Sequence, residues 1–411
     1  ITAYQTFSRS EFNDWDSTRF NESNVFFYND IDVFAQELRL SSNGDGPFSW
    51  MIGAHYADES IDGGFYTNFR GQPNLINTAY GQSVSAFGVF THNSYQVNER
   101  LNLIAGLRWE TEERTLDSGG TSVAPNPPPP TTSYDTDLNE VSGRLGLEYK
   151  LTDDALFYAS VARGVKSGGF TTYNSGLPDQ LEPFKFEELI AYETGVKANL
   201  FDNRLQANAA IYYYDYRDQQ LQGVLYTQTG RVGRMINVPK SHIQGAELEL
   251  RWQPLDNLTI TQAVGYKYGE YDEFFFVNAS ATEAAKDPVT GEYNTIIYSD
   301  RAGERLPFPR FDYKGSIAYE HQIGDWGVEA ETNYAYRSEK FSTSSNSVIG
   351  DYWLMNANLT FRPMNGSYAF GFFVNNLTNA YSEESRNRFI SASTGSPNAP
   401  RTWGARVSYR Y

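Results

Sequence analysis

The chain has 411 residues, a net charge of −17 and no cysteine, and 16% of its residues are aromatic. The absence of cysteine excludes a disulfide scaffold and a thiolate metal site, and the acidic balance argues against nucleic-acid binding. No stretch approaches the ~20 apolar residues that a membrane-spanning helix requires. The 30 tyrosines and 27 phenylalanines exceed what a soluble domain needs and suit the aromatic girdles of a membrane β-barrel.

Segments in which apolar and polar residues alternate recur along the whole chain, and this period of two is that of a β-strand. In one of them Leu103, Leu107 and Trp109 share a face while Arg108 and Glu110 lie on the other. The pattern predicts strands at 1–10, 32–42, 48–58, 83–97, 101–112, 141–151, 155–165, 186–200, 205–221, 242–253, 258–271, 311–322, 326–337, 351–363, 368–376 and 401–411.

The last segment has the strictest alternation. From Trp403 onward every odd residue is apolar or aromatic, and every even residue is small or polar. A membrane barrel has an apolar outer face with aromatic girdles and a polar lumen that tolerates charge. We therefore expect this strand to face the membrane through Trp403, Ala405, Val407, Tyr409 and Tyr411.

The connections alternate between short turns, such as 43–46 and 152–154, and long loops. Long loops are predicted at 59–82, 113–138, 166–185, 272–307 and 377–400. Outer-membrane barrels have short periplasmic turns and long extracellular loops, whereas a sandwich or propeller does not sort its loops in this way. The predicted fold is therefore all-β: an antiparallel transmembrane β-barrel with about sixteen strands.

Short segments in a fixed order resemble the barrel of the TonB-dependent outer-membrane receptors. They are Ile1-Thr2-Ala3-Tyr4, Gln36-Glu37-Leu38-Arg39-Leu40, Ala105-Gly106-Leu107-Arg108-Trp109, Ala162-Arg163-Gly164-Val165-Lys166-Ser167-Gly168-Gly169-Phe170, Tyr192-Glu193-Thr194-Gly195-Val196-Lys197, Gly245-Ala246-Glu247-Leu248-Glu249-Leu250, Val374-Asn375-Asn376-Leu377-Thr378-Asn379 and Ala399-Pro400-Arg401. The resemblance covers residues 1–411 and implies 22 strands around a plugged lumen.

The count of about sixteen strands departs from that number. Because the chain opens on a strand, we expect residues 1–411 to be the C-terminal portion of a longer receptor barrel, with the plug and about six strands outside it. Such a portion alone would leave two open sheet edges, which lipid does not tolerate. A closed ring of sixteen strands would contradict this expectation and would favour a porin.

The resemblance suggests that the segment from Arg163 to Tyr173 lies near the outer vestibule, where basic and aromatic side chains could hold an anionic chelate. The residues predicted to bind ligand are Arg163, Lys166, Phe170, Tyr173, Arg231, Arg234 and Arg337. Each has a structural alternative: Arg163 could pair with a lumen carboxylate, Arg231 and Arg234 could be solvated charges, and Arg337 could belong to the lumen wall.

The sequence contains no catalytic motif such as G-x-S-x-G, H-E-x-x-H or a P-loop, so the chain is not expected to be an enzyme. The acidic loop residues lack the spacing of a Ca²⁺ loop, and no metal site or cofactor is predicted. His55, His92, His242 and His321 lie on or beside predicted strands. A haem receptor requires an accessible axial histidine, so haem is disfavoured as the ligand.

The resemblance implies an outer-membrane receptor of a Gram-negative bacterium that imports a scarce ligand, most often a ferric siderophore. Its implied partners are the outer-membrane lipid and lipopolysaccharide, the assembly machinery of that membrane, and the inner-membrane TonB energy-coupling complex, reached through the missing N-terminal part. Two alternatives stay open: a passive porin of sixteen strands with a closed ring and an inward-folded loop, and a structural barrel that binds partners and transports nothing.

Overall fold

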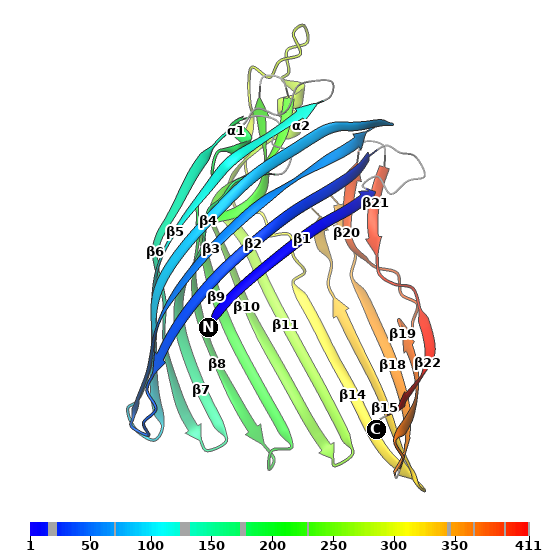
Figure 1. Cartoon of the computed structure of the whole chain (residues 1–411). Helices are drawn as coiled ribbons and strands as arrows, with labels where there is room; N and C mark the ends of the chain where they lie inside the picture. Colours follow the sequence, from blue (N-terminus) through cyan, green and yellow to red (C-terminus); the bar gives the residue numbers. More distant parts are fainter. Residues whose placement is uncertain are drawn as a thin grey trace.

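Sixteen strands form one antiparallel sheet in which each strand pairs with its neighbours in chain order (Figure 1). The computed structural model describes residues 1–14, 23–69, 71–123, 132–172, 178–227, 230–342, 347–364, 366–389 and 392–409. The strands are β1 (Thr2–Asp14), β2 (Ser23–Ser41), β3 (Phe48–Phe69), β4 (Gln72–Gln96), β5 (Leu101–Val123), β6 (Tyr134–Thr152), β7 (Ala155–Lys166), β8 (Glu187–Leu200), β9 (Leu205–Thr227), β10 (Gly230–Leu255), β11 (Leu258–Glu273), β14 (Phe311–Ile323), β15 (Trp326–Arg337), β18 (Tyr352–Pro363), β19 (Tyr368–Asn375) and β22 (Thr402–Tyr409).

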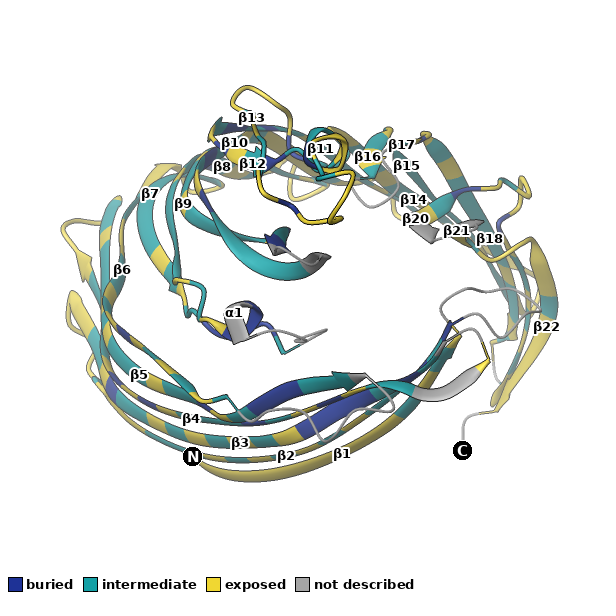
Figure 2. Cartoon of the chain, turned by 90° about the horizontal axis from the view of Figure 1, so that it is seen from above, coloured by how far each residue is buried: buried dark blue, intermediate teal, exposed yellow. Residues whose placement is uncertain are grey.

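The sheet curves into a barrel wall but does not close. Seen from above it forms an arc whose two ends are β1 and β22 (Figure 2). β1 pairs only with β2, and β22 pairs only with β19. The predicted strand count is therefore confirmed, and the closed ring that the porin alternative requires is not present among the described residues.

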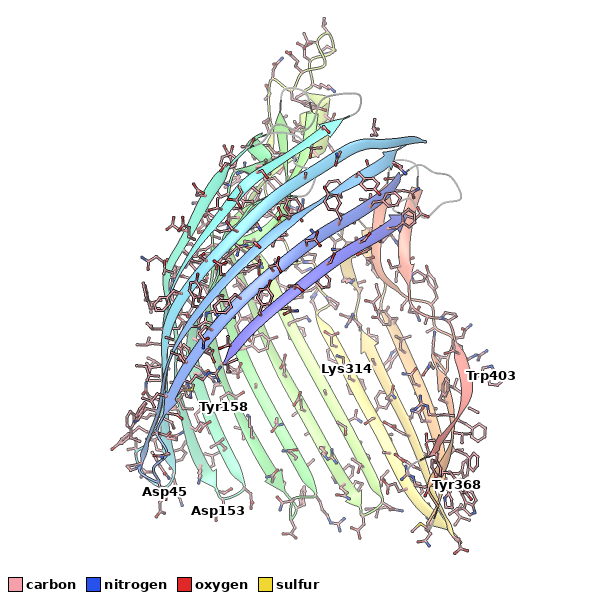
Figure 3. All side chains as sticks on the ribbon, in the orientation of Figure 1. Asp45, Asp153, Tyr158, Lys314, Tyr368 and Trp403 are labelled. Atoms are coloured by element: carbon pink, nitrogen blue, oxygen red, sulfur yellow. The ribbon has the colours of Figure 1, made fainter. Side chains whose placement is uncertain are left out.

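All the short connections predicted by the sequence lie at one end of the sheet, called here the turn end. Figure 3 shows Asp45 and Asp153 in two of these turns at the same end. The opposite end, called here the loop end, carries the connections between β5 and β6, β7 and β8, β11 and β14, β15 and β18, and β19 and β22. This sorting is the one predicted for a membrane barrel.

Three stretches that were predicted to lie outside the strands, 59–82, 113–138 and 222–241, are mostly strand. Most of 59–82 is strand, because β3 runs to Phe69 and β4 begins at Gln72. In 113–138, β5 runs to Val123 and β6 begins at Tyr134. The stretch before His242 is likewise strand, with β9 reaching Thr227 and β10 beginning at Gly230. A strand of 22 residues such as β3 is roughly 70 Å long, far more than the ~25 Å apolar band of a barrel. Its upper part therefore extends beyond that band, and Phe65 and Thr67 are buried there.

The connections at the loop end contain small elements that the sequence pattern does not show. Three hairpins pair β12 (Phe275–Val277) with β13 (Tyr298–Asp300), β16 (Lys340–Ser342) with β17 (Ser347–Ile349), and β20 (Glu383–Phe389) with β21 (Ala392–Pro397). The helices are α1 (Pro178–Leu181) and α2 (Ala279–Ala284). Within the described ranges, neither helix has the length and apolar character needed to cross a membrane.

Alternation separates two faces of the sheet. On β10 the apolar face carries Leu248 and Trp252, and the polar face carries Glu247 and Arg251. The pairing of β10 with β9 and β11 keeps Leu248 beside Ala209 and Val264. The apolar face is therefore continuous across strands, as an outer lipid-facing wall requires.

The closing strand keeps this arrangement. Val407 pairs with Phe370, and Tyr409 pairs with Tyr368. Trp403 and Val407 are 80% and 69% exposed. Ala405 is also exposed, while Tyr411 lies outside the described residues. That these side chains contact lipid stays a prediction, because the structure contains no membrane.

Glycines lie directly opposite aromatic rings in several ladders. An added methyl group at Gly245 would lie 2.5 Å from a ring carbon of Tyr212, its register partner. The same pairing joins Gly53 to Phe90, Gly195 to Tyr158, Gly315 to Tyr334 and Gly404 to Phe373. A ring that covers a glycine restores the side-chain contact that the glycine lacks.

We predict that Gly245→Ala destabilises the barrel. The new methyl group would lie 2.6 Å from the carbonyl oxygen of Tyr266 as well as against Tyr212, so backbone as well as side chain must move. Such overpacking costs about 1–3 kcal/mol. Thermal unfolding of the detergent-purified protein should begin at a lower temperature than in the unchanged protein.

Gly265→Ala is the matched control, because nothing lies within 4 Å of an added methyl group there and Gly265 is on the adjacent strand. It should unfold at the unchanged temperature. Equal shifts of the unfolding temperature in the two variants would contradict the packing argument.

Candidate ligand site at the loop end

Arg163 lies where the ladder between β6 and β7 ends, at the Gly143–Arg163 pair. Its Nε donates to Glu188 and its Nη2 to Glu140, both at 2.8 Å. Its Nη1 donates to the carbonyl oxygen of Val141, on the β6 segment beyond the last pair with β7. The guanidinium thus ties together two separating strands and satisfies a backbone acceptor there.

The segment after β7 turns inward, and α1 lies inside the arc of the sheet (Figure 2). Phe170 is 8% exposed and packs with Leu116 and Leu181. Lys166 is exposed at the end of β7, and Tyr173 lies outside the described residues. Phe170 is therefore an anchor for this segment, and its burial leaves only a small surface for contact with a ligand.

The same segment is held against β10 by polar contacts. The buried Gln180 donates to the carbonyl oxygen of Gly233 at 2.9 Å, and the backbone N–H of Met235 donates to the hydroxyl of Thr171 at 2.9 Å. Arg234 pairs with Glu182 at 3.2 Å. The backbone of Arg231 is in β10, but its side chain is outside what the structure describes.

Arg337 belongs to a row of charges across three strands. Its Nε donates to Asp312 at 3.1 Å, and the other oxygen of Asp312 lies 3.3 Å from Nζ of Lys267. These residues share the polar face, because Asp312 is the register partner of Arg337. The predicted ligand residues whose side chains the structure describes are therefore distributed over β7, the segment after it, β10 and β15.

A cavity of about 1070 Å³ lies instead between the upper parts of β9 to β11, the connection from β11 to β14, and the β16–β17 hairpin. Its cationic lining residues are Arg301, Arg305, Arg310 and Lys340, and its acidic ones are Glu304 and Glu339. The lining thus has a surplus of two positive charges in a chain of net charge −17.

The cations of the cavity differ in their partners. Arg301 donates to Glu304 at 2.7 Å and lies over the rings of Phe274 and Phe276. No ion pair is formed by Arg305 or Arg310 within the described part of the chain. Both are exposed, so their guanidinium groups are available to an anion.

The connection that covers the cavity is fixed by its own core. Leu306, Phe274 and Tyr271 are buried together with Val238 of β10. Further out, the carboxylate of Asp287 accepts the backbone N–H groups of Thr290 and Val289, at 3.0 and 2.7 Å. These hydrogen bonds, that of Thr290 first, lower the pKa of Asp287. The basic lining is therefore held on an ordered support.

Sequence reasoning missed this site because it treated 272–307 only as a long acidic loop. The available signal was three arginines within ten residues, Arg301, Arg305 and Arg310, interleaved with Pro307, Phe308 and Pro309. In an acidic chain such a basic and aromatic segment is unusual. Only the fold brings this segment and Lys340, which is distant in the sequence, to the lining of one cavity.

Comparison with known proteins gives a consistent result. Residues 1–377 match the family model described as "TonB dependent receptor-like, beta-barrel". The pesticin receptor of Yersinia pestis is 28% identical over 221 residues, which cover 53% of this chain and 31% of that protein. A probable TonB-dependent siderophore receptor, PiuA of Acinetobacter baumannii, is 23% identical over 284 residues, or 58% of this chain and 36% of that one.

Solved structures share the fold over nearly the whole chain. The ferric yersiniabactin uptake receptor FyuA of Yersinia pestis superposes with a TM-score of 0.80 at 18% identity, covering 99% of this chain and 58% of FyuA. The siderophore receptor PiuA of Acinetobacter baumannii gives a TM-score of 0.65 at 16% identity, covering 95% and 56%. The chain thus spans about a third of the curated relatives and just over half of these solved chains.

We predict that Phe170→Ala loosens the segment between β7 and β8. Removing a buried aromatic ring costs about 3–5 kcal/mol, and here the loss falls on a local anchor. The amides of Gly169 and Phe184, which donate to each other's carbonyl oxygens, should exchange hydrogen at least tenfold faster.

Lys166→Ala is the control, since this side chain is exposed at the strand end. It should leave both exchange rates unchanged. If Phe170→Ala left them unchanged as well, the anchoring role would be wrong.

Proposed function

The chain belongs to the TonB-dependent receptor-like β-barrel family, and on that basis we propose that it forms the barrel of a receptor that imports a ferric chelate of the siderophore type. Its location is the outer membrane of a Gram-negative bacterium. The relatives named as siderophore receptors support the class of ligand. The family consists of transport receptors rather than enzymes, so the chemistry to be explained is binding and passage.

The observation that carries the proposal is the basic cavity at the loop end. Siderophore-type ferric chelates commonly carry negative charge, and guanidinium groups bind carboxylate and phenolate oxygens through several hydrogen bonds. Arg305 and Arg310 supply such groups without competing ion pairs in the described ranges. Phe276 and Phe308 add apolar surface for the organic part of the ligand.

The sixteen strands serve in this proposal as the C-terminal portion of a larger barrel that surrounds a plug. The open edges of β1 and β22 support it, because unpaired backbone groups are not tolerated in lipid. The relatives support it too, because the chain covers only 58% of the FyuA structure. Further polypeptide would complete the ladder on both sides of the gap seen in Figure 2.

Import then has three steps. The loop end binds the chelate, the inner-membrane TonB complex remodels the plug, and the ligand passes through the barrel. The residues described here contribute to the first step, through the cavity, and to the wall of the passage. No residue of this chain is assigned to coupling. Lipopolysaccharide and the outer-membrane assembly machinery are the remaining proposed partners.

We predict that replacing both Arg305 and Arg310 by alanine in the complete receptor weakens binding of an anionic ferric chelate by ten- to hundredfold. A charge-assisted hydrogen bond contributes about 1.5–3 kcal/mol, and a tenfold change corresponds to about 1.4 kcal/mol, so the expected range equals the net loss of one such bond. Ferric yersiniabactin and ferric citrate are the first probes, titrated by quenching of tryptophan fluorescence. Uptake of radiolabelled iron by cells producing the variant should fall in parallel.

Arg204→Ala provides the control. This arginine pairs with Asp256 at the turn end, so its loss should not change chelate affinity. Unchanged affinity in the double variant for a probe that the unchanged receptor binds would refute the assignment of the cavity.

A further inference from the structure

A second cluster of ligating side chains lies on the opposite face of the sheet from the lumen charges. His242 of β10 shares its face with Leu248 and Trp252, and the register of β10 is regular from Ser241 to Trp252. His242 pairs with Glu270 of β11 on one side and with Asp215 of β9 on the other. The cluster therefore lies on the outer wall, at the loop-end side of the apolar band.

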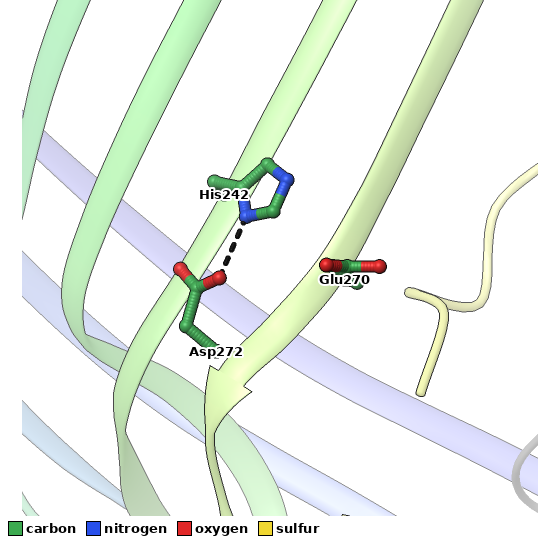
Figure 4. Close-up of side chains that lie close together, drawn as sticks. All are labelled: His242, Glu270 and Asp272. Atoms are coloured by element: carbon green, nitrogen blue, oxygen red, sulfur yellow. Dashed lines mark hydrogen bonds and ion pairs between the residues drawn. The ribbon is translucent and has the colours of Figure 1, made fainter. Parts of the chain in front are cut away.

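Three of these side chains converge. One ligand atom each from His242, Glu270 and Asp272 lies within 4.8 Å of the other two (Figure 4). Nδ1 of His242 and Oδ1 of Asp272 are 2.8 Å apart. Ligand atoms of a tetrahedral ion are about 3.4 Å apart when each bond is ~2.1 Å. Small side-chain rotations are enough to reach that geometry.

Each side chain is also held in place by its surroundings. The hydroxyl of Tyr268 donates to Oε2 of Glu270 at 2.8 Å, which leaves Oε1 for another partner. The imidazole of His242 stacks on the ring of Tyr213, with centroids 5.6 Å apart. Groups that orient the ligands in this way are typical of metal sites.

The cluster also contains carboxylate oxygens that lack partners. Oδ2 of Asp272 and Oδ1 of Asp215 are fully buried, and neither has a hydrogen bond within the described residues. Such a buried acceptor costs free energy, and more when it is charged. Arg217 reaches Asp215 only at 3.9 Å. Three carboxylates on an apolar wall are therefore short of positive charge.

We propose that His242, Glu270 and Asp272 bind a divalent transition-metal ion such as Zn²⁺ on the outer wall of the barrel. The ion would neutralise the carboxylates and join β10 to β11 through side chains as well as backbone. One imidazole nitrogen with carboxylate oxygens suits Zn²⁺ and its neighbours, whereas Ca²⁺ and Mg²⁺ prefer oxygen alone. The site does not depend on the proposed ligand cavity, whose lining does not include these three residues.

The test uses the complete receptor, purified in detergent and stripped of metal with a chelator. Calorimetric titration with Zn²⁺ should show saturable binding, and the bound ion should raise the unfolding temperature. His242→Ala and Asp272→Asn should each weaken Zn²⁺ binding at least tenfold. Because asparagine has nearly the same shape as aspartate, the second variant still tests the proposal if the first folds poorly. X-ray absorption at the zinc edge should show imidazole scattering that His242→Ala removes.

Two controls are matched to the ligands. Glu249→Gln removes an exposed carboxylate from the polar face of the same strand, and His321→Ala removes a histidine that stacks on Tyr319. Both should bind Zn²⁺ as the unchanged protein does. The proposal is overturned if the unchanged receptor binds no Zn²⁺, if Asp272→Asn binds it equally well, or if Mg²⁺ in equal concentration displaces it.

Discussion

The antiparallel main-chain ladder is the constraint on which the rest of this structure depends. A backbone N–H or C=O exposed to lipid has no partner, so a spanning sheet must pair every strand. Fifteen ladders between neighbours in the chain order meet this condition inside the sheet, and one edge each of β1 and β22 is left unpaired. The ladder also fixes the pairing register of neighbouring strands. This register keeps the apolar side chains of all strands on one face of the sheet and the polar ones on the other.

Side chains reinforce the ladder in two ways. Aromatic rings cover glycines of the next strand, as Tyr212 covers Gly245, so the many tyrosines stabilise strand pairs as well as forming girdles. Where backbone pairing ends, charged side chains form hydrogen bonds between the strands instead. Arg163 donates hydrogen bonds to Glu140, Glu188 and the carbonyl oxygen of Val141 at the point where β6 and β7 separate.

The loop end combines two electrostatic environments. The cavity covered by the β11–β14 connection is basic and partly aromatic, which suits an anionic ligand arriving from outside. A few residues away along β10 and β11, the outer wall carries Asp215, Glu270 and Asp272 around His242, which suits a cation. The basic groups lie on the β11–β14 connection and the β16–β17 hairpin, whereas the acidic cluster lies on the strands β9 and β11.

The sequence by itself determined the all-β class, the number of large strands and the sorting of the turns, because period-two alternation and turn residues are local signals. It also indicated the family, which the match over residues 1–377 confirms. The strand extensions beyond the membrane were missed because turn-type residues, such as Asp62, Gly63 and Gly64 in β3, interrupt the apolar–polar alternation there. Only the tertiary structure decided which charges come together: Arg305 and Lys340 line one cavity, and His242 contacts Asp272 across a ladder. Such contacts depend on register and loop packing between residues far apart in the chain, and no local pattern encodes them.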